Sequence, residues 1–252
     1  MSIVGKLLGK TGSLRSLTRP FRKKARHLVR FRLARMKRAR IGAEIVAITG
    51  SSGKSTATRL ISRFLQTRFA TREQAYQNTI SACTQAILDA TPTDEYLVIE
   101  TGASVPGSVV EMAGLMKPKV AVVTMVNVEH RSAFKTIENV TKEKGALVEA
   151  VAEGGFAVLN ADDENAIAMA ERTKQRIVTF GHVNDADYRV VELGLGDSGT
   201  MELAIRSAHG THRLSTKLMG IHFWPSVAAA LHRIADACVD VRRRSFVAMP
   251  TQ

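Results

Sequence analysis

The sequence predicts an α/β protein with a doubly wound, mostly parallel sheet of the P-loop type, a small antiparallel β meander and a basic helical arm in front. From Glu44 onward, short β-branched runs alternate with helical stretches. Strands that are apolar throughout and separated by helices indicate a parallel sheet covered on both faces. The first such run leads into a Gly- and Ser-rich loop that ends in Lys54 and Ser55, which is typical of phosphate binding.

The arm comprises residues 1–40, which contain 14 Lys and Arg and no acidic residue. The other 212 residues are nearly neutral, with 22 basic and 23 acidic side chains. We expect little stable structure in Met1–Pro20, because Gly, Ser and Pro recur there. Phe21–Arg40 lacks both Gly and Pro, and its apolar side chains share one helical face. These side chains are Phe21, Ala25, Leu28, Val29, Leu33 and Met36.

Two roles of this amphipathic helix stay open. Its basic and apolar character fits contact with an anionic membrane surface or a partner. Alternatively, the apolar stripe packs on the domain and the charges are solvated. Nucleic acid is the weakest candidate partner, because residues 41–252 are nearly neutral and lack an aromatic-rich basic face.

The alternating segments predict the elements of the sheet in chain order. The expected strands are Ile45–Thr49, Tyr96–Glu100, Val120–Val126, Phe156–Asn160 and Ile177–Phe180. Helices are expected over Ser55–Thr67, Ser81–Ala90, Ile137–Ala152, Asp163–Arg172 and Ser226–Cys238. Tyr188–Thr216 shows alternation and Gly-rich turns, which predicts the antiparallel meander. We therefore expect one domain over residues 41–240 and a short basic tail over 241–252.

Composition excludes several classes of protein. No apolar run reaches the roughly 20 residues of a membrane-spanning helix, and the basic start is not followed by the apolar core of a secretory signal. Cys83 and Cys238 are the only cysteines, so neither a disulfide framework nor a zinc site is indicated. A cytoplasmic setting is the expectation, with the arm allowing a peripheral position at the inner membrane face.

The loop after Ile45–Thr49 has the parts that phosphate binding needs. Gly50 and Gly53 allow the backbone to turn and approach an anion, and the following helix start presents N–H groups and partial positive charge. Lys54 supplies a full charge and Ser55 a hydroxyl for Mg²⁺. The candidate nucleotide-binding residues are Gly50, Ser51, Ser52, Gly53, Lys54, Ser55 and Thr56. The motif is the short GxxGKS form, and an N-capped Ser/Gly turn is the alternative.

Other polar residues follow the ends of neighbouring strands, where ligands bind in open parallel sheets. Glu100, His130 and Asn160 are such residues, and Asp162 and Asp163 come directly after Asn160. A carboxylate beside phosphates is a natural magnesium ligand, and a neutral imidazole also binds metals. Each has a structural alternative: Glu100 or an aspartate could cap a helix, and His130 could be a solvent-facing loop residue.

Together these residues resemble the central, ATP-binding domain of the Mur ligase family. The similarity spans residues 45–236 and is strongest to the branch that adds D-alanyl-D-alanine. Six segments carry the similarity: ITGSSGKST at Ile48–Thr56, Glu100–Ala103 with Gly107, Pro118–His130, Phe134–Leu147 with its K-x-K-G, Gly155–Asp163, and Gly220–His222 with Ala228–Leu231.

The resemblance implies a reaction and residue roles. In this family ATP phosphorylates a substrate carboxylate, and an amine attacks the acyl phosphate to give an amide. By position, Lys54 would grip the phosphates, and Ser55 and Glu100 would hold Mg²⁺. His130 would lie by a second metal, which Lys144 would support if it is carbamylated; Lys142 is the competing assignment. Asn160 would face the adenine.

The implied ligands are ATP and Mg²⁺, with a small-molecule or polymer carboxylate acceptor and an amine donor as substrates. The sequence also departs from the family pattern. Ser226 stands where the closing motif has Asn. The arm takes the place of the family's N-terminal domain, and the chain ends where its C-terminal domain would begin. A nucleotide-binding module without independent ligase activity is therefore the alternative function.

Overall fold

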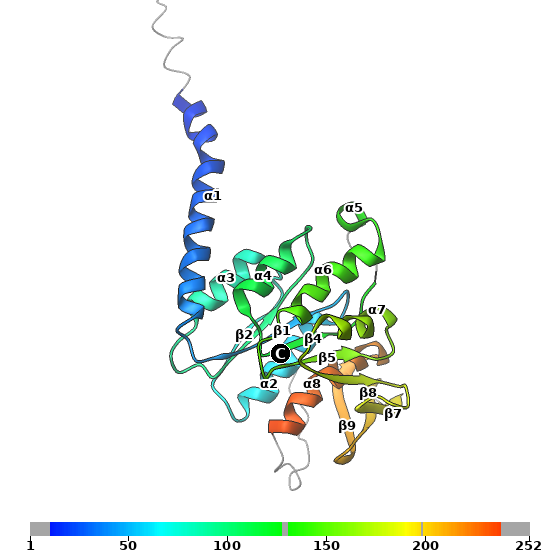
Figure 1. The fold of residues 1–252 in the computed structure, drawn as a ribbon. Coiled ribbons are helices and arrows are strands. Elements are labelled where there is room, and N and C mark those ends of the chain that lie inside the picture. The colour runs from blue at the N-terminus through cyan, green and yellow to red at the C-terminus, as the bar shows by residue number, and fades with distance from the viewer. Residues whose placement is uncertain (1–10, 128–130, 198, 238–252) are drawn as a thin grey trace, which may run out of the picture.

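The computed structural model describes residues 11–127, 131–197 and 199–237, and side chains within 25–127, 133–197 and 199–230 (Figure 1). These residues form one nine-stranded sheet with the order β2-β3-β1-β4-β5-β6-β7-β8-β9. The strands are β1 Glu44–Thr49, β2 Thr71–Gln74, β3 Tyr96–Glu100, β4 Val120–Val123, β5 Phe156–Asn160, β6 Arg176–Gly181, β7 Tyr188–Leu195, β8 Thr200–Ser207 and β9 Gly210–Met219. Pairing is parallel from β2 to β7 and antiparallel from β7 to β9.

Helices cover both faces of the parallel part. They are α1 Thr11–Arg38, α2 Lys54–Gln66, α3 Ile80–Asp89, α4 Ser108–Met116, α5 Arg131–Phe134, α6 Ile137–Glu149, α7 Glu164–Ile167 and α8 Trp224–Ala237, with short 3₁₀ helices at Ala168–Arg172 and Ile221–Phe223. Ile45 and Ala47 of β1 face the core below α3, α4 and α6. Val46 and Ile48 face the opposite core, with α2 and α8. None of the described helices is long and apolar enough to cross a membrane.

Successive strands are added first on one side of β1 and then on its other side. After β1 the chain passes through α2 to β2, returns to β3 beside β1, and then crosses to β4 on the other side of β1. The carboxyl end of β1 is therefore the switch point of the sheet, where ligands bind in open α/β folds.

The predicted fold class is confirmed. All five expected strands are present, and the meander forms β7, β8 and β9. One feature was not expected: β6 pairs with β7 in parallel, Phe180 opposite Tyr188, so the meander continues the main sheet. The expected helix over Asp163–Arg172 is divided into α7 and a 3₁₀ turn.

Two expectations about the extent of elements were wrong. The strand expected over Val120–Val126 ends at Val123, because Thr124 and Met125 turn to bind the loop after β1. The prediction of little structure in Met1–Pro20 fails from Thr11 onward, where α1 begins. The arm and tail boundaries at residues 40 and 241 stay predictions, and residues 238–252 lie outside the described part.

The sequence patterns did not predict β2, α4, α5 or the 3₁₀ helix at Ile221–Phe223. β2 has the polar sequence Thr-Arg-Glu-Gln, and as an edge strand it needs no apolar alternation. α4 is preceded by Gly107 in a left-handed conformation and contains Gly114, both of which weaken a helix prediction.

Glu143 of α6 stabilises the start of α4. One carboxylate oxygen accepts from Gly107 N at 2.9 Å and the other from Val109 N at 2.7 Å. Since Gly107 provides no side-chain cap, this carboxylate satisfies N–H groups that α4 leaves unpaired. The negative charge also complements the helix dipole.

We predict that Glu143→Ala lowers the free energy of unfolding by about 1.5–3 kcal/mol, because it removes a charged acceptor from buried N–H groups. Glu149→Ala on the same helix is the matched control. Its carboxylate is largely exposed and contacts Arg172 at the surface, so its loss should cost less than about 1 kcal/mol. Urea unfolding measures both, and equal losses would contradict this role of Glu143.

Candidate functional site

The loop between β1 and α2 depends on its two glycines. Gly50 has φ 148° and Gly53 has φ 78°, conformations that favour glycine. Space gives a second reason. A Cβ atom on Gly50 would collide with Thr124 Oγ1, and one on Gly53 would lie 2.6 Å from Ser226 Oγ.

Neighbouring elements hold the loop in place. Ser51 N donates to Met125 O at 2.7 Å, and Thr124 Oγ1 donates to Ser52 O at 2.6 Å. From the other side, Ser226 Oγ at the start of α8 donates to Gly53 O at 3.0 Å. Ser226, which departs from the resemblance, therefore supports the loop backbone, a role that the sequence did not indicate.

The N-terminus of α2 lacks the side-chain cap that other helices have. Its N-cap is Gly53, with no side-chain hydrogen bond. By contrast, Thr79, Thr136 and Asp163 cap α3, α6 and α7. The alternative of an ordinary N-capped turn is therefore wrong for α2. Its first-turn N–H groups and partial positive charge suit an anion.

Two lysines from different helices bind the same carbonyl oxygen. Lys54 Nζ donates to Gly50 O at 2.7 Å, and Lys144 Nζ donates to it at 2.9 Å. Lys144 is fully buried, whereas its competitor Lys142 is exposed. The structure therefore brings Lys144, and not Lys142, to the loop.

Ser55 and Glu100 form the candidate metal-binding pair. Ser55 Oγ donates to Glu100 Oε2 at 2.7 Å, and Tyr76 N donates to the same oxygen at 2.8 Å. Glu100 is only 3% exposed. Its alternative role as a helix cap is wrong, since α4 begins at Ser108 and is capped by Glu143. The described residues contain no cluster of three or more His, Cys, Asp or Glu side chains that could hold a metal.

The remaining candidates have different surroundings. Asn160 is buried; its Nδ2 donates to Thr124 O at 2.9 Å and its Oδ1 accepts from Asp162 N at 3.0 Å. Asp163 caps α7, which confirms the capping alternative, and also accepts from Val126 N. His130 lies outside the described residues, so its role as a metal ligand stays a prediction.

At the same edge, the predicted strand-end residue Asp162 joins His182 and Trp224, which sequence reasoning missed. Asp162 Oδ2 lies 2.8 Å from His182 Nδ1, and the His182 ring meets the Trp224 ring edge-on with centroids 4.5 Å apart. Trp224 is two residues from Ser226, so the cluster lies close to the phosphate loop. No sequence signal links these residues, because they come from three separate segments.

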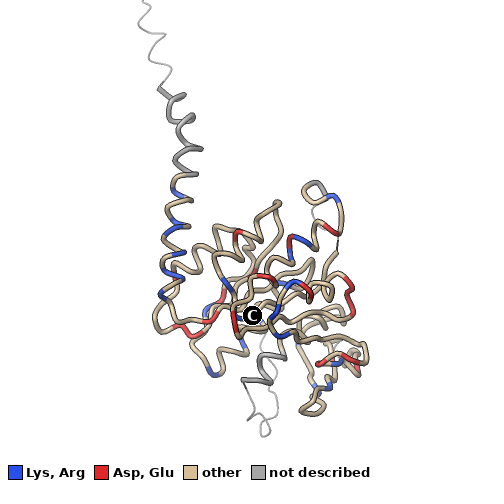
Figure 2. The backbone as a smooth tube through the Cα atoms, viewed as in Figure 1, with Lys and Arg blue, Asp and Glu red and all other residues tan. Residues whose placement is uncertain are grey.

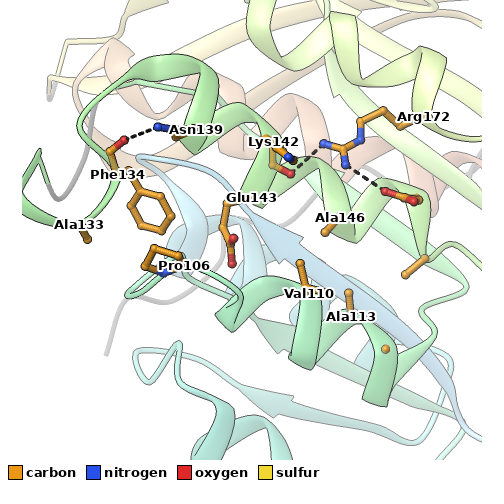
Figure 3. A pocket seen from close by; sticks show the side chains of 13 residues that line it. Pro106, Val110, Ala113, Ala133, Phe134, Asn139, Lys142, Glu143, Ala146 and Arg172 are labelled. Atoms are coloured by element: carbon orange, nitrogen blue, oxygen red, sulfur yellow. Dashed lines mark hydrogen bonds and ion pairs between the residues drawn. The ribbon is translucent and has the colours of Figure 1, made fainter.

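A hollow of about 600 Å³ lies between α4 and α6, apart from the loop (Figure 3). Val110 and Ala113 line one wall and Ala146 the other, with Phe134 at one end. Glu143 faces this hollow, whereas Lys144, the next residue of α6, reaches the phosphate loop. α6 therefore separates the two regions.

These features define a P-loop-type α/β domain with an acidic side chain at the strand end beside the loop. The sequence model of the Mur ligase middle domain matches residues 48–233, and the chain belongs to this family. The resemblance drawn from the motifs is thereby confirmed.

Similar proteins include UDP-N-acetylmuramoyl-tripeptide–D-alanyl-D-alanine ligases. That of Mycobacterium leprae is 31% identical over 54% of this chain and 27% of its own length. That of Escherichia coli is 28% identical over 82% of this chain and 47% of its own. The chain thus spans between about a quarter and half of these relatives.

Solved structures support the fold. MurF from Acinetobacter baumannii superposes with a TM-score of 0.77 at 20% identity, over 83% of this chain and 46% of MurF. MurF from Thermotoga maritima in complex with ADP gives a TM-score of 0.75 at 22% identity, over 84% of this chain and 49% of that one.

The Asp162–His182 contact makes a prediction about acid stability. Burial raises the pKa of Asp162, but hydrogen bonds from the His182 ring and from the backbone N–H groups of His182 and Val183 outweigh it and lower the pKa below the usual value. The contact therefore stabilises the fold above about pH 4, the ordinary aspartate pKa, and is lost as the pH falls through the lower folded value.

We expect Asp162→Asn to remove this contribution, so that stability changes less steeply below pH 4 than in the wild type. Unfolding measured by urea between pH 2 and pH 6 tests this, with Asp197→Asn as a surface control. Equal slopes in wild type and Asp162→Asn would contradict the assignment.

Proposed function

We propose that this chain binds ATP and Mg²⁺ at Gly50–Thr56 and is the ATP-binding part of a ligase that joins a carboxylate to an amine. The observation that carries the proposal is the contact of Ser55 with Glu100 beside the uncapped start of α2. This arrangement lies at the switch point of the sheet, where a ligand is expected. The relatives' names as ligases and the ADP complex of one of them add support.

The proposed phosphate contacts come from the chain's own backbone and lysines. First-turn N–H groups of α2 would donate to the phosphate oxygens. Lys54, on a flexible stem from that same turn, would exchange its bond to Gly50 O for a charge-assisted bond to phosphate. Lys144, held at the same carbonyl, would keep positive charge at the mouth of the loop or, if carbamylated, support a second metal together with His130.

The residues present fit Mg²⁺. It prefers hard oxygen ligands and commonly takes only one or two carboxylates, with water and phosphate completing its shell. Ser55 and Glu100 supply two such oxygens in direct contact, at the end of β3 next to the loop. Bound there, Mg²⁺ would neutralise charge on the phosphates during transfer. Asn160 remains the proposed adenine-side residue.

The proposed reaction has two steps. A carboxylate oxygen of the acceptor attacks the γ-phosphorus of ATP, the bond to the β-phosphate breaks, and ADP leaves. The amine nitrogen then attacks the acyl carbon, loses a proton, and phosphate leaves. The acceptor is a small molecule or polymer bearing a carboxylate. We place the reaction in the cytoplasm.

The alternative is a nucleotide-binding module without ligase activity of its own. It is supported by the short span of the chain relative to its relatives. ADP release that requires both a carboxylate and an amine, with amide product by mass spectrometry, supports the ligase. Tight ATP binding without amide product for any acceptor supports the module.

Lys54→Ala tests the phosphate site. We expect ATP affinity to fall about 100-fold, equivalent to about 3 kcal/mol, because charge-assisted bonds to phosphate are lost. Lys142→Ala, which removes an exposed lysine from α6, should leave affinity unchanged. Calorimetric titration with ATP measures both, and normal affinity in Lys54→Ala would refute the site.

Glu100→Gln tests the metal site. The amide keeps the shape and an acceptor for Ser55 and Tyr76 but removes the charge that holds Mg²⁺. We therefore expect the Mg²⁺ concentration needed for half-maximal ATP binding to rise about tenfold, while affinity measured in EDTA stays the same or improves. An unchanged Mg²⁺ dependence would remove Glu100 from the metal site.

A further inference from the structure

α1 is anchored to the body through one side of the helix. Ala34 is fully buried and Phe31 packs beside it, in the core that α3 and α4 share. Lys37 Nζ donates to Leu88 O near the end of α3, and Arg38 Nε donates to Met116 O at the end of α4, at 2.7 Å. Cations at helix C-termini complement the negative ends of the dipoles. These contacts turn the side of α1 opposite Phe31 and Ala34 away from the body of the protein.

The opposite side exposes the apolar stripe. Leu28, Val29, Leu33 and Met36 are 50–56% exposed, although they are the side chains that the helical pattern grouped together. At 100° per residue they span about 140° of the helix, roughly opposite Phe31 and Ala34. The alternative that this stripe packs on the domain is therefore wrong for these four residues.

Cations border the stripe. Arg35 lies beyond its Leu28 edge, Arg26 beyond its Leu33 edge, and Arg32 within it, and all three are exposed. No acidic residue precedes Glu44, and Figure 2 shows Lys and Arg along the described part of α1 with no Asp or Glu among them. An apolar stripe bordered by arginines is complementary to a surface with negative charge on its outside and an apolar layer just beneath.

We propose that this face of α1 lies on an anionic membrane surface. Leu28, Val29, Leu33 and Met36 enter the boundary between headgroups and acyl chains, as in interfacial amphipathic helices. Arg26, Arg32 and Arg35 bind lipid phosphates. The ligase domain is thereby held at the surface, and α1 meets the bilayer in an orientation set by its contacts with α3 and α4.

The charges disfavour the other occupants. In a symmetric dimer through this stripe, the three arginines of each copy would face like charges, which destabilises the contact. Nucleic acid would engage the cations but leave four exposed aliphatic side chains in water. Of these three, a lipid surface is the one that uses both the cations and the apolar side chains.

Flotation of the full chain with vesicles tests the proposal. We expect binding to vesicles of phosphatidylglycerol and phosphatidylcholine, and little binding to phosphatidylcholine alone. Arg26→Gln/Arg32→Gln/Arg35→Gln should weaken partitioning about 100-fold, since each cation near an anionic surface contributes about fivefold. Val29→Asp/Leu33→Asp/Met36→Asp should weaken it at least as much, because the inserted apolar area is lost.

Controls change exposed cationic and apolar residues elsewhere. Arg63→Gln/Lys174→Gln/Lys217→Gln removes three exposed charges from the body, and Leu195→Asp/Met219→Asp alters two exposed apolar residues. Both should bind vesicles like the wild type, and all variants should keep the wild-type unfolding transition. The proposal is overturned if the arginine or aspartate variants of α1 bind vesicles like the wild type. It is also overturned if the full chain forms a dimer in sedimentation without vesicles and these variants abolish it, or if the chain binds DNA or RNA but not vesicles.

Discussion

The carbonyl oxygen of Gly50 is the point on which the site depends. It accepts hydrogen bonds from Lys54 of α2 and Lys144 of α6, so two helices on opposite faces of the sheet meet at one atom. The position exists because β1 lies between β3 and β4, and because Gly50 packs where a side chain would strike Thr124. The residue before Lys144 in α6, Glu143, fixes the start of α4.

The elements that the sequence predicted well are those whose signal is local. β1, β3 and β5 are short, apolar and β-branched, and they are buried almost throughout, so their pattern and their environment agree. β2 and α4 could not be predicted in that way. β2 is stabilised by its pairing with β3, and α4 by a carboxylate 34 to 36 residues further along the chain. Neither interaction leaves a trace in the segment itself.

The same distinction applies to the site. GxxGKS after an apolar strand predicted the loop between β1 and α2, and the rule about strand ends placed Glu100 beside it. The residues that hold the loop could not be found this way. Ser226 lies 173 residues from the carbonyl it binds, and Trp224 meets His182 from a separate segment. From the sequence, Ser226 is only a departure from the family's closing motif. In the structure its hydroxyl donates a hydrogen bond to the loop between β1 and α2.

The loop between β1 and α2 combines features that each cost stability. The N-terminus of α2 has no side-chain cap, and Gly50 and Gly53 lose more backbone entropy on folding than other residues would. Proteins retain such local conflicts at functional sites, where a ligand resolves them. The proposed polyphosphate would supply acceptors for the helix N–H groups and negative charge for Lys54 and Lys144. If the proposed polyphosphate binds at this loop, binding stabilises the folded domain, and the free energy of unfolding rises with the logarithm of the ligand concentration above the Kd.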